Sequence, residues 1–236
     1  MEKTIILGDI HGRSIWKDIV KKENPDRVIF LGDYCTTHED VPSKDQIDNF
    51  LEILDFKENS GKEVILLRGN HDIQFFGEDF TKGWSGYDSY VAEHFPLERF
   101  IKNSQWLVTF HIYPDGIPRQ YVCSHAGVSQ IWLERILNFT GTIEHINSLE
   151  FGPEFGFTGG YFDTHGDDPQ QSLTWIRPQS LLRCMAHPHQ IVGHSPVKEL
   201  TKLFSKEADI ELWLCDALGV GEYLIVEDNE LKQGKL

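Results

Sequence analysis

The chain has 236 residues, of which 40% are hydrophobic and 25% charged, as in an ordinary globular protein, and we expect one domain over residues 1–236. Its formal net charge of −15 argues against a bulk nucleic-acid binder, because such binding needs clustered Lys and Arg to displace counterions from phosphates. No apolar run approaches the length of a membrane span and no signal segment opens the chain, so we expect a cytoplasmic protein without membrane contact.

The first third of the chain predicts alternating strands and helices. Short, continuous apolar runs indicate buried strands at residues 4–7, 27–31 and 63–67. Two helices between them show apolar residues at helical spacing, namely Ile15, Trp16, Ile19 and Val20 in the first and Ile47, Phe50, Leu51 and Leu54 in the second. This order is typical of an α/β fold with a parallel sheet.

The middle of the chain predicts a helical insertion followed by a hairpin. Residues 73–105 are rich in aromatics and include a predicted helix over residues 88–102. Strands at 106–112 and 120–123 flank the turn Pro114-Asp115-Gly116, which indicates an antiparallel hairpin.

Helical segments and a long loop come next. Ser129 is expected to cap a helix that ends near Leu137, and a shorter helix is expected over residues 142–149. The segment 151–170 predicts a long loop of functional importance.

The last third predicts a strand at residues 190–192 and a pair of strands in the tail. The tail strands, at 210–215 and 222–226, flank the turn Gly219-Val220-Gly221. We expect them to form an antiparallel hairpin that closes a second sheet.

The four cysteines, Cys35, Cys123, Cys184 and Cys215, are scattered without CxxC pairs, which suits reduced thiols better than disulfides. A cysteine-dependent phosphatase needs an arginine six residues after its nucleophile, and none of the four has one. That class of enzyme is excluded.

Five predicted strands end in loops that carry polar side chains beside glycines. These loops supply Asp9, His11, Asp33, Asn70, His125 and His194. Because ligands bind at the carboxyl ends of strands in such sheets, we expect the loops to converge. Their oxygen and nitrogen donors suit first-row divalent metals, and two metals sharing one carboxylate would use such a set.

The ordered blocks GDIHG (8–12), GD (32–33), GNHD (69–72), SHAG (124–127) and GHSP (193–196) resemble the calcineurin-like metallophosphoesterases. The similarity is to the branch that holds the phosphoprotein (Ser/Thr) phosphatases, in its bacterial and phage form, and it spans nearly the whole chain. The resemblance implies an α/β fold, a two-sheet β-sandwich flanked by helices in four αββα layers.

The resemblance also implies the role of each ligand. Asp9 and His11 would hold one metal, Asp33 would bridge, and Asn70, His125 and His194 would hold the other. The cofactors would be two divalent metal ions, with Mn²⁺ favoured over Fe or Zn. His71 would be the general acid that protonates the leaving alkoxide after in-line attack of a metal-bridging hydroxide.

Binding of the phosphoryl group needs positive charge, preferably a planar guanidinium. Arg177 resembles the arginine of the bacterial and phage members, and Asn70 would contact substrate as well as metal. Arg13 and Arg68 flank ligand loops and are weaker candidates, each expected to pair with surface carboxylates.

One departure from the family pattern lies in the second block. Where the phosphoprotein phosphatases have an aspartate that orients the catalytic histidine and an arginine that grips phosphate, this chain has Thr36 and Thr37. Asp72, Glu39 or Asp40 are candidates to orient the histidine instead.

Three functions remain open. The first is a phosphomonoesterase of the Ser/Thr protein phosphatase type, acting on a phosphoprotein or a small phosphoester. The second is a bis(5'-nucleosyl)-tetraphosphatase-like hydrolase of nucleotide polyphosphates, and the third is a scaffold that keeps the fold without the chemistry. Retention of six ligands and His71 argues against the scaffold.

Overall fold

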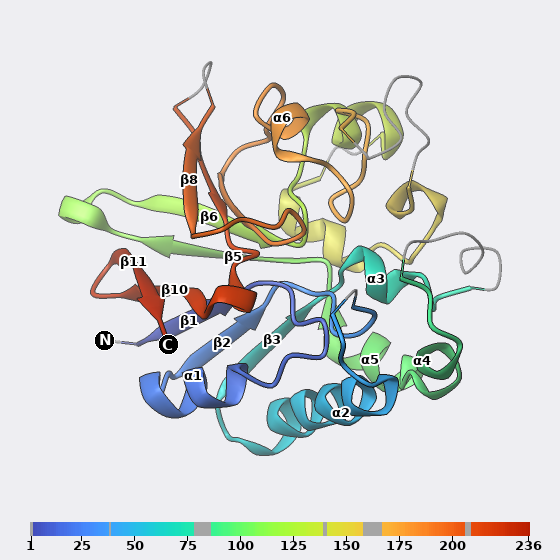
Figure 1. Cartoon of the computed structure of the whole chain (residues 1–236). Helices are drawn as coiled ribbons and strands as arrows, with labels where there is room; N and C mark the ends of the chain where they lie inside the picture. The colour runs from blue at the N-terminus through green and yellow to red at the C-terminus, as the bar shows by residue number, and fades with distance from the viewer. Residues whose placement is uncertain (1, 38, 78–85, 139–140, 158–166, 206–208) are drawn as a thin grey trace.

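The computed structural model describes residues 2–37, 39–77, 86–138, 141–157, 167–205 and 209–236. Its strands form two sheets that face one another, with helices on the outer sides (Figure 1). The predicted α/β sandwich of two sheets flanked by helices is therefore confirmed. Among the helices of these described segments, none has the length and apolar character needed to cross a membrane.

The six-stranded sheet has the order β11-β10-β1-β2-β3-β4. Its strands are β1 (Thr4–Leu7), β2 (Arg27–Phe30), β3 (Glu63–Leu67), β4 (Ser104–Gln105), β10 (Glu222–Glu227) and β11 (Glu230–Lys235). Strands β1 to β4 pair in parallel, β10 pairs antiparallel with β1, and β11 pairs antiparallel with β10. Helices α1 (Trp16–Glu23) and α2 (Ser43–Asn59) connect the first three strands and cover the outer face (Figure 1).

The five-stranded sheet has the order β5-β6-β7-β9-β8. Its strands are β5 (Leu107–Ile112), β6 (Arg119–Ser124), β7 (His189–Val192), β8 (Thr201–Phe204) and β9 (Glu211–Leu214). The predicted β5–β6 hairpin is confirmed, and its connection contains the 3₁₀ turn η2 (Pro114–Gly116). Because β6, β7 and β9 run parallel, their carboxyl ends share one edge of this sheet.

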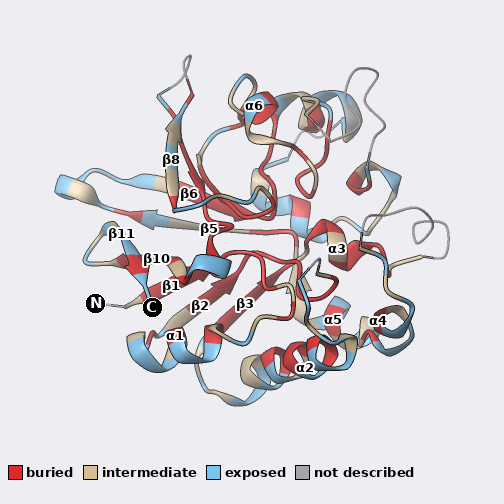
Figure 2. Cartoon of the chain, in the orientation of Figure 1, coloured by how far each residue is buried: buried red, intermediate tan, exposed pale blue. Residues whose placement is uncertain are grey.

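Side chains alternate along each strand between two apolar layers, as the pleat of a strand requires. Ile5 and Leu7 of β1 pack with the helices, whereas Ile6 packs between the two sheets with Ile191 and Trp213. Figure 2 shows the resulting continuous burial of the central strands in both sheets. The carboxyl ends of these strands are thus held by packing on both sides.

The predicted tail hairpin is wrong. Strand β9 pairs with β7 and β8, whereas β10 pairs with β1 and β11, so the two tail strands lie in different sheets. The 3₁₀ turn η6 (Leu218–Val220) carries the chain from one sheet to the other. Strands β8 and β11 were not predicted because their sequences, TKLF and ELKQGK, are too polar to show an apolar run at the sheet edges.

The predicted helix over residues 88–102 is also wrong in its extent. It is interrupted at Phe95 and Pro96, giving α4 (Ser89–His94) and α5 (Leu97–Asn103). Proline cannot continue a helix and forces the residue before it into an extended conformation, here φ −62° and ψ 123°.

The outer side of the five-stranded sheet carries short helices. The Trp132 N–H bonds to the Ser129 hydroxyl at 2.9 Å, so the predicted cap is present, but the segment it begins is a π-helix, η3 (Trp132–Ile136). The other short helices that follow strands of this sheet are η4 (Ile143–Ser148), η5 (Pro153–Phe155) and α6 (Pro178–Leu181), whereas α3 (Asn70–Ile73) directly follows β3 of the six-stranded sheet. Of the expected loop 151–170, residues 158–166 lie outside the described part of the chain.

Candidate active site

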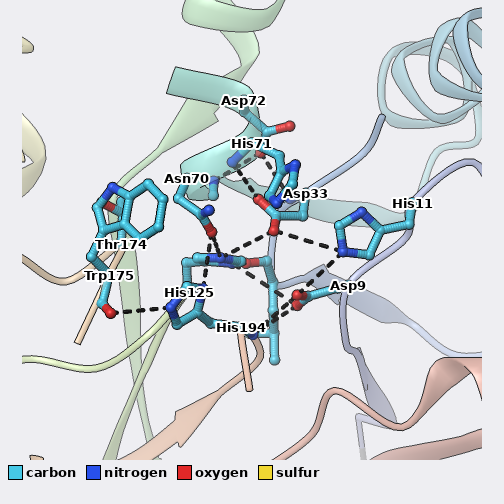
Figure 3. Close-up of polar contacts among 12 residues, drawn as sticks. Asp9, His11, Asp33, Asn70, His71, Asp72, His125, Thr174, Trp175 and His194 are labelled. Carbon is cyan, nitrogen blue, oxygen red and sulfur yellow. Dashed lines mark hydrogen bonds and ion pairs between the residues drawn. The ribbon is translucent and has the colours of Figure 1, made fainter. Parts of the chain in front are cut away.

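The six predicted ligands meet where the carboxyl ends of strands from both sheets face each other (Figure 3). They are Asp9, His11, Asp33, Asn70, His125 and His194, which follow β1, β2, β3, β6 and β7. Five of them line a cavity of about 420 Å³, and the sixth, His125, is fully buried beneath it. The sequence blocks, distant along the chain, therefore form one cluster.

Two groups within this cluster have donor atoms close enough to hold a cation. Ligand atoms of Asp9, His11 and Asp33 lie within 4.8 Å of one another, and so do those of Asp33, His125 and His194. Asn70 joins the second group, because its Oδ1 lies 2.8 Å from His125 Nε2 and 2.9 Å from His194 Nδ1. Carboxylate, amide and imidazole donors with one shared carboxylate fit a pair of first-row divalent ions.

Backbone carbonyl groups select which nitrogen of each histidine can bind a cation. A carbonyl only accepts hydrogen bonds, so the ring nitrogen facing it carries the proton and the other keeps its lone pair. The three contacts are His11 Nδ1 to Thr36 O at 3.0 Å, His125 Nδ1 to Leu31 O at 2.8 Å, and His194 Nε2 to Trp175 O at 3.1 Å. The nitrogens left for ligation are Nε2, Nε2 and Nδ1, and these are the atoms that point into the cluster.

The glycines of the sequence blocks are required by this crowding of carboxylates. A Cβ at Gly69 would lie 2.1 Å from Asp33 Oδ1, and one at Gly193 would lie 2.2 Å from Asp9 Oδ1. Several residues at the site also adopt positive φ angles, including His11 at 45°, Asp33 at 53° and His194 at 60°. Such backbone strain in non-glycine residues is typical of functional sites, where surrounding structure enforces it.

The charges of the cluster are strongly coupled. Burial opposes ionisation of Asp33, yet the positive rings of His125 and His71 hold its pKa well below the usual range. Burial favours the neutral ring of His125, but the carboxylates of Asp33 and Asp9 raise its pKa to about 10. Burial and the charge on His125 lower the pKa of His194 well below its usual value, so this ring is neutral and can donate its lone pair.

Metal binding should therefore release protons. The pKa of His125 is about 10 in the folded metal-free protein, against 6.5 ordinarily. Protonation of His125 therefore stabilises the folded chain. This contribution to the free energy of unfolding is complete below pH 6.5 and is lost as the pH rises through 10. A cation needs the neutral ring, so at pH 7.5 we expect release of about one proton and an affinity that rises with pH. Calorimetry of Mn²⁺ binding in buffers of different ionisation enthalpy measures this, and heat independent of the buffer would contradict it.

Asp72 fixes the loops that carry the ligands. Its carboxylate accepts the backbone N–H groups of Asp33 at 2.9 Å, Tyr34 at 3.0 Å and Gly69 at 2.8 Å. Burial and the charge on Asp33 raise the pKa of Asp72 to about 7, while these three donors oppose the rise. Its oxygens serve the backbone, so Asp72 is not the residue that orients His71.

Thr36 contacts His71 instead. The Thr36 hydroxyl donates to the Cys35 carbonyl at 2.6 Å and lies 2.6 Å from His71 Nδ1, so it accepts the Nδ1 proton. The backbone N–H of His71 donates a second hydrogen bond, to Asp33 Oδ1 at 2.8 Å. Of the other two candidates for this role, Glu39 pairs with Arg13 and Asp40 is exposed.

Removing the Thr36 hydroxyl should loosen His71 without removing it. We expect Thr36→Val to lower kcat by roughly tenfold, because a buried donor is left unpaired at a cost of about 1–3 kcal/mol. KM and bound metal should stay near wild type. Thr36→Ser keeps the hydroxyl and serves as the control, so equal kcat values for the two variants would contradict an orienting role.

The three arginines of the sequence blocks have different positions. Arg177 lines the cavity, and its Nη1 donates to the His194 carbonyl at 3.0 Å. Arg13 also lines the cavity and pairs with Glu39, as expected. Arg68 is not among the cavity residues, and its guanidinium lies 4.6 Å from the Trp106 ring while donating to backbone carbonyls. Arg68 forms no ion pair with a carboxylate among the described residues, so the predicted surface ion pair is wrong for this arginine.

Sequence reasoning assigned no role to Asp216, which lines the same cavity and is 8% exposed. Burial raises its pKa, while the nearby charges of His11 and Arg13 oppose the rise. The signal that could have found it is its place directly after a buried strand, the same position that Asp9 holds after β1.

Comparisons with known proteins agree with this geometry. The model of the family described as calcineurin-like phosphoesterase matches residues 3–220. Over 179 residues the chain is 25% identical to the serine/threonine-protein phosphatase 4 catalytic subunit of Eremothecium gossypii, an alignment that covers 72% of this chain. It covers 50% of that relative, so the chain spans about half the length of the curated relative it matches.

Solved structures with the same arrangement include two phosphatases. The cold-active protein-tyrosine phosphatase of a Shewanella species superposes with a TM-score of 0.62 at 17% identity, covering 100% of this chain and 78% of that one. A protein serine/threonine phosphatase from Saccharomyces cerevisiae gives a TM-score of 0.55 at 13% identity, covering 100% and 79%. At these identities the likeness shows a shared fold.

Proposed function

The chain belongs to the calcineurin-like phosphoesterases, and we propose that it is a phosphomonoesterase that removes phosphate from phosphorylated side chains or small phosphoesters. The observation that carries the proposal is the pair of cation-binding groups that share Asp33 and lie beside His71 in one cavity. The 25% identity to the serine/threonine-protein phosphatase 4 catalytic subunit of Eremothecium gossypii supports a reaction of the Ser/Thr protein phosphatase type.

The residues present fit two divalent ions. Asp9 and His11 would hold one, Asn70, His125 and His194 the other, and Asp33 both. When bound, such ions lower the pKa of a shared water and polarise the phosphoryl group. Mn²⁺ is our first choice, with Fe and Zn as alternatives, because the set combines hard oxygen and borderline nitrogen donors.

His71 is proposed as the general acid. The Thr36 hydroxyl accepts a hydrogen bond from His71 Nδ1–H, so that proton is not available to the substrate. The proton for the leaving alkoxide would come from Nε2. The His71 backbone N–H donates to Asp33 Oδ1, which holds this residue beside the shared carboxylate. A positioned acid of this kind contributes about 10²–10⁴-fold to the rate.

Arg177 is proposed to bind the phosphoryl oxygens. Its Nη1 contacts the carbonyl of the candidate ligand His194, which places the guanidinium at the rim of the cluster. A planar guanidinium can offer paired N–H donors to phosphate. Asn70, which also lines the cavity, is proposed to contact substrate as well as metal.

The test is a substrate panel with the Mn²⁺-loaded protein. We expect phosphate release from an aryl phosphate and from phosphopeptides, and strict dependence on added metal. Cleavage of a diadenosine polyphosphate with little phosphopeptide turnover would reassign the site to nucleotide polyphosphates. Absence of both bound transition metal and turnover across the panel would refute the proposal and favour a scaffold.

A further inference from the structure

Arg13 is a second guanidinium in the cavity that contains Arg177. It follows a turn in which His11 and Gly12 have φ angles of 45° and 76°, so the chain folds back on itself. As a result, Arg13 Nη1 donates to the backbone carbonyl of Asp9 at 3.2 Å. The guanidinium is thereby fixed beside a candidate metal ligand.

The other edge of this guanidinium carries an ion pair at the cavity rim. Arg13 Nε lies 3.2 Å from each carboxylate oxygen of Glu39, and Nη2 bonds to the same carboxylate. The Glu39 side chain is 52% exposed and that of Arg13 only 19%, so the carboxylate is the outer partner. The Thr37 hydroxyl accepts the Glu39 N–H at 2.9 Å and so fixes the loop that presents the carboxylate.

The guanidinium has donors beyond those contacts. Of the five N–H groups of an arginine, the described residues engage Nε–H, one on Nη2 and one on Nη1. One N–H on each Nη therefore remains for a ligand, within the part of the chain that the structure describes. Guanidinium N–H groups form strong, charge-assisted hydrogen bonds with phosphate oxygens.

We propose that Arg13 binds the phosphoryl group of the substrate together with Arg177, and that Glu39 holds Arg13 in place and lowers its affinity for phosphate. The inference rests on the proposed function. An exposed carboxylate gains little from its ion pair with arginine, because solvent screens the charges. A doubly charged phosphate in the cavity can therefore bind the N–H groups that Glu39 leaves free, and the Glu39 carboxylate opposes this binding only by partly neutralising the charge of the guanidinium.

The test is binding of inorganic phosphate to the Mn²⁺-loaded chain, measured by calorimetry beside KM and kcat for an aryl phosphate. Arg13→Gln should weaken phosphate binding by roughly 10- to 100-fold and raise KM, with bound manganese unchanged. Glu39→Gln should do the reverse and tighten phosphate binding by about two- to fivefold. In the Arg13→Gln background, Glu39→Gln should have no effect, because it acts through Arg13.

Two controls accompany these variants. Arg99 pairs with Asp55 and Glu58 on the surface outside the cavity, so Arg99→Gln removes a paired arginine without changing phosphate binding. Arg13→Lys keeps the charge but not the planar donors, and should bind phosphate with intermediate affinity.

The inference is overturned if wild type binds no phosphate, if Arg13→Gln binds it normally or loses manganese, or if Glu39→Gln acts equally in both backgrounds. Phosphate binding without turnover of any ester would instead refute the proposed function. The comparison of Arg13 variants by phosphate binding would still decide the role of this arginine.

Discussion

His71→Asn is expected to lower kcat by about 10²–10⁴-fold while bound manganese stays at the wild-type level. Asparagine is close in size but cannot deliver a proton to a leaving alkoxide. The fall should be smaller for an aryl phosphate with an acidic phenol, which leaves without protonation, than for an alkyl phosphate. Steady-state kinetics with both esters, together with metal analysis of the purified variant, measure this.

The matched control removes a histidine elsewhere. His94 is exposed and its Nδ1 lies 2.9 Å from the Tyr90 carbonyl, outside the cavity. We therefore expect His94→Asn to retain the wild-type kcat. Full activity of His71→Asn on the alkyl phosphate would show that another group is the general acid.

Asp33→Asn is expected to lower kcat by at least about 10³-fold, because Asp33 belongs to both cation-binding groups. The amide keeps an oxygen but loses the negative charge that two neighbouring cations need. Metal analysis should show less than one bound ion per chain, against two in the wild type.

Asp9→Asn provides the comparison, since Asp9 belongs to one group only. This variant should keep the ion held by Asn70, His125 and His194 and lose the other. Two firmly bound ions in Asp33→Asn would rule out the shared carboxylate. Circular dichroism of both variants verifies that the fold is retained.

The clustering of the candidate site residues could be predicted from the sequence more completely than the pairing of the strands around them. Asp9, Asp33 and His194 each stand beside a glycine at the end of a buried apolar strand, and this local pattern survives folding because sheet geometry brings strand ends together. The tail could not be predicted in the same way. Whether β9 and β10 share a sheet depends on which neighbours they pair with, and pairing is a nonlocal property that local propensity does not encode.

The supporting contacts of the site were also hidden in the sequence. Asp72 reads as part of the GNHD block and was considered as a partner of His71, but it bonds to backbone groups of the loop after β2. Thr36 was interpreted as the place where the orienting aspartate of the family is missing, although its hydroxyl contacts His71. Both outcomes depend on the relative placement of two loops that lie about 35 residues apart in the chain, and no periodicity or spacing rule fixes that placement.

The candidate ligands come from both sheets, which has a thermodynamic consequence. Asp33 and Asn70 follow strands of the six-stranded sheet, whereas His125 and His194 follow strands of the five-stranded sheet. A cation held by all four can bind only while the two sheets are packed together. Part of its binding free energy is therefore folding free energy, so the association of the two halves of the sandwich is coupled to the metal concentration around the protein.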